Sequence, residues 1–216
     1  MQASNKESYL ERLLCFSSKK TAHSEAEKIG SVFTEPLDIA SANSRVMQNR
    51  TGCSEQTAEF IRLVASINSR RLTDEFKIGR KYTKSEIERY ICALLFHLTV
   101  ESVYMISFDK NGKLLSCDLI TEGTVNSSAF LPRKMADIAL SKRAASIILA
   151  HNHPSGNPFP SNNDIAVTLL AESVLKDAHI RLDAHYITVG FNIYDCLKEI
   201  KESSKVKTEI VKINPV

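Results

Sequence analysis

The spacing of apolar residues in the second half of the chain predicts alternating helices and strands. Apolar positions at helical spacing follow the capping box TKSE at 83–86, so we expect a helix to about residue 97. The segment 100–109 is rich in β-branched and aromatic residues. It is followed by Asn111-Gly112, a dipeptide typical of two-residue hairpin turns, and then by KLLSCDLITEG at 113–123. The pattern therefore predicts that an antiparallel strand pair follows this helix in the chain.

The same alternation continues towards the C-terminus. Pro132 opens a helical pattern, at the position where its missing N–H costs least. The continuous apolar run AASIILA at 144–150 predicts a buried strand, after which a helical pattern reaches about Ala178. We expect a further strand over 186–190 and a last short helix over 192–203. These elements predict an α/β (α+β) fold with a mixed sheet flanked by helices.

The first part of the chain carries helical patterns and no strand signal. Short helices are predicted over 8–16, 23–33, 36–47 and 55–67. The polar segment 68–82 is rich in Lys and Arg; a linker between domains is its simplest account, and a role in nucleic-acid binding is the alternative. We therefore expect a helical region with a basic linker at 1–82, a second domain at 83–203, and an edge strand or tail at 204–216.

Composition is that of an ordinary globular protein. The 216 residues are 43% hydrophobic and 25% charged, which allows one full domain with a buried core and a smaller appendage. No apolar run approaches the roughly 18 residues of a membrane span. The N-terminus has acids where a signal peptide needs a basic region followed by an apolar core. We therefore expect a cytoplasmic protein without a membrane segment.

The cysteines and the net charge argue against disulfide and cysteine-metal sites, but they do not indicate a particular function. The five cysteines are scattered without a CxxC pair, which argues against a disulfide framework and against cysteine-ligated zinc. We expect reduced thiols that pack as small hydrophobic side chains. The net charge of +3 permits weak attraction to nucleic acid without requiring it.

Side chains that can bind a metal ion or take part in catalysis are concentrated in HNHPSGNPFPSNND at 151–164, between the buried strand and the following helix. His151 and His153 are two residues apart, so at an extended strand end both side chains lie on one face and can converge on one ion. Asp164, in the first turn of the helix, supplies a third ligand and leaves a fourth tetrahedral position for water, as in catalytic zinc sites. Zinc makes such a water acidic near pH 7 and polarises a carbonyl.

Each of these residues also has a structural explanation. An isolated H-x-H is weak evidence, because a histidine at a strand end is more often hydrogen-bonded than a metal ligand. Asp164 can be the acid of a capping box that Ser161 opens. The combination with the Pro-Ser-Gly turn and two further prolines favours the metal site, because a simple connection needs none of these residues.

Together, HNHPSG and the following P-S-x-x-D resemble the RadC-like proteins, which carry a JAB1/MPN domain with the JAMM metalloprotease motif. The resemblance covers essentially the whole chain and implies an N-terminal helical region followed by an MPN/JAB-like mixed sheet, with cytidine-deaminase-like layering. It implies that Zn²⁺ is bound by His151, His153 and Asp164. It also implies that Ser161 helps to stabilise an oxyanion and that Glu101 is the general base.

The residues themselves leave the identity of the base open. Glu101 stands at the entrance to a buried strand, where a charged residue is either solvent-exposed or near a cation, and Glu122 on the next strand is the competing acid. The family's late Asp-His pair appears here as Asp183-Ala184-His185, with altered spacing. We therefore leave Asp183 and His185 outside the predicted site and assign His185 to the core or to an edge strand.

Two functions follow as hypotheses. The leading one is a zinc-dependent hydrolase of amide or isopeptide bonds, a metallopeptidase whose peptide or protein substrate the sequence does not name. The alternative is a DNA-associated repair or recombination factor in which the MPN domain is a structural or protein-binding module. The RadC resemblance implies it through an association with DNA repair. Its discriminating feature is residues 50–58, which resemble a helix-hairpin-helix with Gly52 retained and Ser54 as the next N-cap, and Arg50 in place of the first glycine weakens this alternative. An ordinary αα-corner is the competing account of this turn.

Overall fold

The computed structural model describes residues 3–96, 98–123 and 130–203 of the chain. Its contacts divide the chain into two compact units, Met1–Asp74 and Glu75–Val216. Within the described ranges, no helix is both long enough and apolar enough to cross a membrane.

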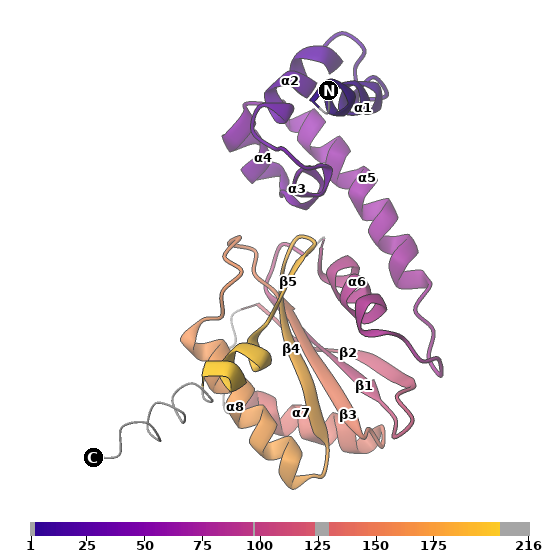
Figure 1. Ribbon diagram of the computed structural model, residues 1–216, viewed down its shortest axis with the longest axis vertical. Coiled ribbons are helices and arrows are strands. Elements are labelled where there is room, and N and C mark those ends of the chain that lie inside the picture. The colour runs from indigo at the N-terminus through magenta and orange to yellow at the C-terminus, as the bar shows by residue number, and fades with distance from the viewer. Residues whose placement is uncertain (1–2, 97, 124–129, 204–216) are drawn as a thin grey trace, which may run out of the picture. The chain divides into compact units, whose positions relative to one another are not determined.

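The first unit is built from helices that bury one apolar core. They are α1 (Ala3–Leu14), α2 (Ala22–Gly30), α3 (Pro36–Ser41), α4 (Ser44–Thr51) and α5 (Glu55–Asp74) (Figure 1). The single helix predicted over 36–47 is wrong, because Asn43 interrupts it. The Asn43 side chain accepts a hydrogen bond from the Val46 N–H and so begins α4 as an N-cap.

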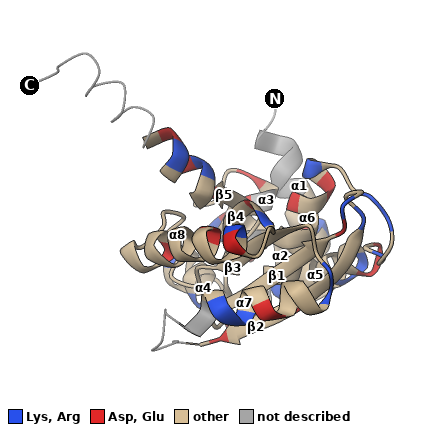
Figure 2. Cartoon of the chain, turned by 90° about the horizontal axis from the view of Figure 1, so that it is seen from below, with Lys and Arg blue, Asp and Glu red and all other residues tan. Residues whose placement is uncertain are grey.

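The segment 68–82 contains the end of α5 and a group of stacked aromatic rings, and its role as a linker stays a prediction. α5 continues to Asp74, well past its predicted end. Beyond α5, the Phe76 ring stacks on Tyr82 and Tyr90, at centroid distances of 3.8 and 3.9 Å. Over the chain as a whole, Figure 2 shows both Lys or Arg and Asp or Glu on the drawn elements, and within α5 Arg70 pairs with Asp74. The Phe76 ring therefore carries tyrosine rings where a nucleic-acid base could have stacked, and nucleic-acid binding by this segment stays a prediction.

The second unit contains a five-stranded mixed sheet. Its elements are α6 (Lys84–Leu95), β1 (Ser102–Phe108), β2 (Leu114–Glu122), α7 (Phe130–Ser141), β3 (Ser146–Asn152), α8 (Asn162–Asp177), β4 (Arg181–Val189) and β5 (Asn192–Asp195). The strand order is β2-β1-β3-β4-β5. β3 and β4 run parallel, whereas the other neighbouring pairs are antiparallel. The predicted α/β (α+β) fold is confirmed.

Helices cover both faces of this sheet (Figure 1). α6 packs on one face, in a core that includes Ile148 of β3. α7 and α8 pack on the other face, in a core that includes Ile147. Because side chains alternate along a strand, His151 at the end of β3 points to the α8 face and Asn152 to the α6 face.

The hairpin between β1 and β2 differs from its prediction. Its loop holds residues 110–112 between the paired Asp109 and Lys113, rather than two residues. The Asp109 carboxylate accepts the N–H groups of Asn111 and Lys113, both at 2.8 Å. Gly112 takes a φ of +76°, which glycine adopts at little cost. The Asp109 side chain therefore selects the longer loop.

The boundaries of several later elements also differ. α7 begins at Phe130, so Pro132 lies inside its first turn. β4 begins at Arg181, earlier than the predicted residue 186. Residues 192–195 form β5 instead of helix, and the helix covers only 196–203. The edge strand or tail predicted at 204–216 lies outside the described residues.

Candidate metal centre

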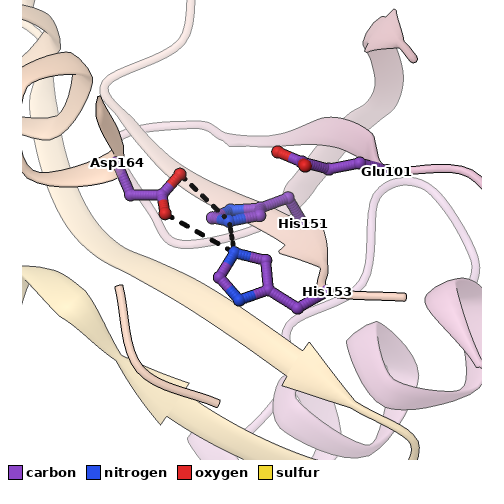
Figure 3. A group of neighbouring side chains, drawn as sticks. All are labelled: Glu101, His151, His153 and Asp164. Carbon is purple, nitrogen blue, oxygen red and sulfur yellow. Dashed lines mark hydrogen bonds and ion pairs between the residues drawn. The ribbon is translucent and has the colours of Figure 1, made fainter. Parts of the chain in front are cut away.

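Four side chains converge at the end of β3 (Figure 3): Glu101, His151, His153 and Asp164. Their ligand atoms all lie within 4.8 Å of one another. His151 Nε2 is 2.9 Å from His153 Nε2 and 3.3 Å from Asp164 Oδ1. Ligands about 2.0–2.1 Å from a tetrahedral zinc ion are separated by roughly 3.3 Å. The spacing of these atoms therefore fits a single ion.

The two histidines are held by strand pairing on both sides of β3. His151 lies between Val103 of β1 and Ile187 of β4 in the sheet register. The His153 N–H donates to the Thr188 carbonyl at 2.9 Å, which continues the β3–β4 pairing past the end of β3. The backbone that carries both side chains is thus fixed before any ion binds.

The capping box that provides a structural explanation for Asp164 is present at the start of α8. Asp164 Oδ2 accepts hydrogen bonds from the Ser161 N–H at 2.7 Å and from the Ser161 hydroxyl at 2.6 Å. The Asp164 N–H donates back to Ser161 Oγ at 3.2 Å. Oδ1 faces His151 instead. Oδ2 also lies 3.5 Å from His153 Nε2, but its two capping hydrogen bonds leave Oδ1 as the oxygen for a metal ion, so capping and metal binding by Asp164 are compatible.

Ser161 is therefore placed to orient Asp164. A hydroxyl has one proton, and the Ser161 proton is directed at Asp164 Oδ2. Its predicted oxyanion role requires that proton to turn towards a substrate, and this role stays a prediction.

The electrostatics of the cluster favour an anionic Asp164 beside the two rings. Burial acts to raise the pKa of Asp164, but its interactions with His151, His153 and Ser161 outweigh burial and hold the pKa well below its usual range. The interaction with Asp164 raises the pKa of His153 against the opposing effect of burial. The site thus attracts a positive charge, whether a proton or a metal ion.

The loop after β3 fixes the orientation of the His153 ring. His153 Nδ1 lies 2.7 Å from the Asn157 carbonyl oxygen. A carbonyl only accepts, so Nδ1 carries the proton, and in the neutral ring Nε2 presents its electron pair to the cluster.

Glu101 comes from the segment just before β1 and is tied to β3 by Asn152. The buried Asn152 side chain accepts a hydrogen bond from the Ser102 N–H at 2.9 Å and donates to the carbonyls of Val100 and Leu98 at 3.0 and 3.2 Å. Asn152 thus fastens the backbone on both sides of Glu101 to the strand that carries the histidines. Glu122 lies opposite Ser102 in the β1–β2 pairing and is not a member of the cluster.

His185 lies beside the cluster although the predicted site omits it. Its Nε2 is 3.0 Å from His151 Nδ1, and its Nδ1 is 2.6 Å from the Thr168 hydroxyl. Burial lowers the pKa of His185 to about 3. The sequence carries no local signal for this contact, because it depends on the pairing of β3 with β4. Asp183 instead pairs with Arg181 on the exposed side.

The turn between α4 and α5 has the backbone of a capped helical hairpin. Gly52 ends α4 with a φ of +68°, and the predicted N-cap Ser54 accepts the Thr57 N–H at 3.2 Å. The buried Glu25 carboxylate accepts the Ser54 N–H at 2.7 Å and a hydrogen bond from Lys28 at 2.8 Å. The chain's own acid thus occupies an amide that a phosphate would use. Weak nucleic-acid binding by this region stays a prediction.

Comparison with protein families finds a match to the second unit. The family model of the RadC-like JAB domain matches residues 82–201, more than half of the chain. Residues before 82 lie outside the match, so the resemblance expected over the whole chain is shown for the second unit.

Several bacterial proteins are similar to the chain over comparable lengths. A UPF0758 protein of Bordetella avium is 40% identical over 127 residues, 58% of this chain and 56% of that protein. UPF0758 proteins of Finegoldia magna and Pasteurella multocida are 36% and 34% identical, over 56% and 63% of this chain and 53% and 62% of their own lengths. The chain therefore spans less than two thirds of these relatives.

Proposed function

Because the chain belongs to the RadC-like JAB domain family, we propose that it is a zinc-dependent hydrolase of amide or isopeptide bonds. One observation carries the proposal. His151 Nε2 and His153 Nε2 are 2.9 Å apart and border the anionic Asp164. Electron-pair donors this close to one another need a cation among them, and two imidazoles with one carboxylate are a ligand set typical of catalytic zinc.

A zinc ion held by these residues supplies a Lewis acid that polarises a carbonyl and makes water acidic near pH 7. Glu101 is exposed, whereas His151 and Asp164 are buried, so the substrate approaches on the Glu101 side. Glu101 accepts a proton from the water while the water oxygen bonds to the carbonyl carbon. It then delivers that proton to the nitrogen as the carbon–nitrogen bond breaks.

The experiment compares the zinc-loaded protein with two variants on fluorogenic peptide libraries and on acyl groups linked to the lysine side-chain nitrogen. Glu101→Gln should keep zinc and lose hydrolysis by about 10²–10⁴-fold, because proton transfer is lost while the ligands remain. Glu122→Gln, which alters an acid outside the cluster, should hydrolyse like the unmodified protein.

If the zinc-loaded protein cleaves neither kind of bond faster than Glu101→Gln does, the hydrolase proposal is wrong. The alternative, a structural or protein-binding JAB domain, would then account for a metal site without turnover.

A further inference from the structure

We propose that Thr168 and His185 form a hydrogen-bonded relay that fixes the proton of His151 on Nδ1, and so presents the Nε2 electron pair of His151 to the metal. The inference rests on the proposed metal site. It assigns a positioning role to two residues that lie behind the ligands, away from the bound ion and the substrate.

The relay has three links, and both of its ends are metal-site residues. The Thr168 hydroxyl donates to the Asp164 carbonyl at 2.5 Å and lies 2.6 Å from His185 Nδ1. His185 Nε2 lies 3.0 Å from His151 Nδ1. Thr168, His185 and His151 are almost completely buried, so bulk water does not compete for these hydrogen bonds.

Counting protons gives the relay a single direction. A carbonyl oxygen only accepts, so the one proton of the Thr168 hydroxyl points at Asp164. The hydroxyl oxygen must then accept from His185, which places the His185 proton on Nδ1. In the neutral ring Nε2 is the acceptor, so His151 donates from Nδ1. The reverse direction would leave two oxygen acceptors 2.5 Å apart with no proton between them.

His153, the other histidine ligand, also carries its proton on Nδ1, but it needs no relay. His153 Nδ1 donates directly to the Asn157 carbonyl. His151 needs the relay because its Nδ1 faces the side chain of His185 on the neighbouring strand β4. Both ligands thus offer Nε2 to one point. The relay also connects the first turn of α8 to β3, which fixes the spacing between Asp164 and His151.

Partners behind a metal ligand change metal affinity by about 10–100-fold when they are removed. Thr168→Val removes the hydroxyl and keeps the shape, so zinc affinity should fall by that factor in a chelator competition. Thr168→Ser retains the hydroxyl and should restore the affinity. His185→Leu should weaken zinc binding as Thr168→Val does. His185→Gln can keep an acceptor oxygen near the place of Nε2 and should lose less.

A matched control removes a buried hydroxyl elsewhere on the sheet. Ser107 Oγ on β1 is buried and has no hydrogen-bond partner among the described residues. Ser107→Ala should therefore leave zinc affinity unchanged, which separates the relay from general effects of altering the core.

The direction of the relay is tested without zinc and without a variant. Long-range ¹H–¹⁵N correlations of the metal-free protein at mildly alkaline pH report which ring nitrogen of each histidine carries the proton. We expect Nδ1–H for His151 and His185. A proton on Nε2 of His151 would overturn the inference, even if every variant failed to fold.

Zinc binding by the unmodified protein and by the variants separates a failure of the proposed function from a failure of the relay. If the unmodified protein does not bind zinc, the proposed function fails. If it binds zinc and folded Thr168→Val and His185→Leu bind equally tightly, the relay is wrong and the metal site stands.

Discussion

Two helices of this protein begin in almost the same way and differ in what faces the acid. At α5 the Glu25 carboxylate accepts the N–H of the N-cap Ser54 at 2.7 Å. At α8 the Asp164 carboxylate accepts the N–H of the N-cap Ser161, also at 2.7 Å. Both acids are buried, and hydrogen bonds lower the pKa of both against the effect of burial. In each case the anion lies at the positive end of a helix.

The difference lies in the second oxygen of each carboxylate. Glu25 Oε1 accepts a hydrogen bond from Lys28 at 2.8 Å, so its charge is balanced within the chain. Asp164 Oδ1 faces the ring nitrogen of His151. A capping acid therefore becomes a candidate ligand when its second oxygen borders other electron-pair donors instead of a built-in cation. The position of an acid at a helix start is not evidence by itself.

Replacing Asp164 and Glu25 separately by alanine should give the largest effects and is the strongest test of this difference. Asp164→Ala removes one of three ligands, so zinc affinity should fall by more than the roughly hundredfold expected for a partner behind a ligand. Glu25→Ala should leave zinc affinity unchanged. It should lower the free energy of unfolding by about 1–3 kcal/mol, because charge-assisted hydrogen bonds to Ser54 and Lys28 are lost. Calorimetric zinc titration and urea unfolding measure the two quantities. Equal zinc affinity in both variants would erase the proposed distinction.

Acid should affect the two helix starts at different pH. Zinc needs neutral imidazoles, and the pKa of His153 is raised above its ordinary 6.5 in the metal-free protein. Zinc affinity should therefore fall by roughly tenfold per pH unit below that raised pKa. In the metal-free protein, protonated His153 stabilises the fold below pH 6.5, and this contribution is lost as the pH rises through the raised pKa.

Glu25 responds only in stronger acid. Its pKa is lowered from 4.5 to about 2, so its contribution to stability is present above pH 4.5 and is lost as the pH falls towards 2. Unfolding of Glu25→Gln should accordingly vary less with pH over this range than unfolding of the unmodified protein. An unchanged slope would show that Glu25 is not the group responsible.

The smallest expected effect compares the two N-cap serines. Ser161→Ala and Ser54→Ala should each cost about 1 kcal/mol of stability, because each removes a hydroxyl cap. Only Ser161→Ala should also weaken zinc binding, since the Ser161 hydroxyl orients Asp164. Zinc affinity that stays constant in Ser161→Ala would leave that hydroxyl free for the predicted oxyanion role.

Local signals in the sequence account for the parts of the site that were predictable. The capping boxes at Thr83 and Ser161 join residues three apart, so their pattern is visible without the fold. The alternation along a strand likewise places His151 and His153 on one face. Glu101 could be selected over Glu122 only through the family resemblance, because its closeness to β3 depends on the β1–β3 pairing and on Asn152.

Contacts between residues far apart along the chain were not predictable from the sequence. His185 meets His151 because β3 and β4 pair in a parallel register that sets Leu149 opposite His185. Glu25 reaches Ser54 across 29 residues, through packing of helices within the first unit. Neither contact follows from spacing along the chain.

Anomalous scattering at the zinc edge from crystals of zinc-loaded protein tests the central claim most directly. We predict one strong peak at about 2.0–2.1 Å from His151 Nε2, His153 Nε2 and Asp164 Oδ1. A fully zinc-loaded protein whose peak lies away from these three atoms would contradict the account.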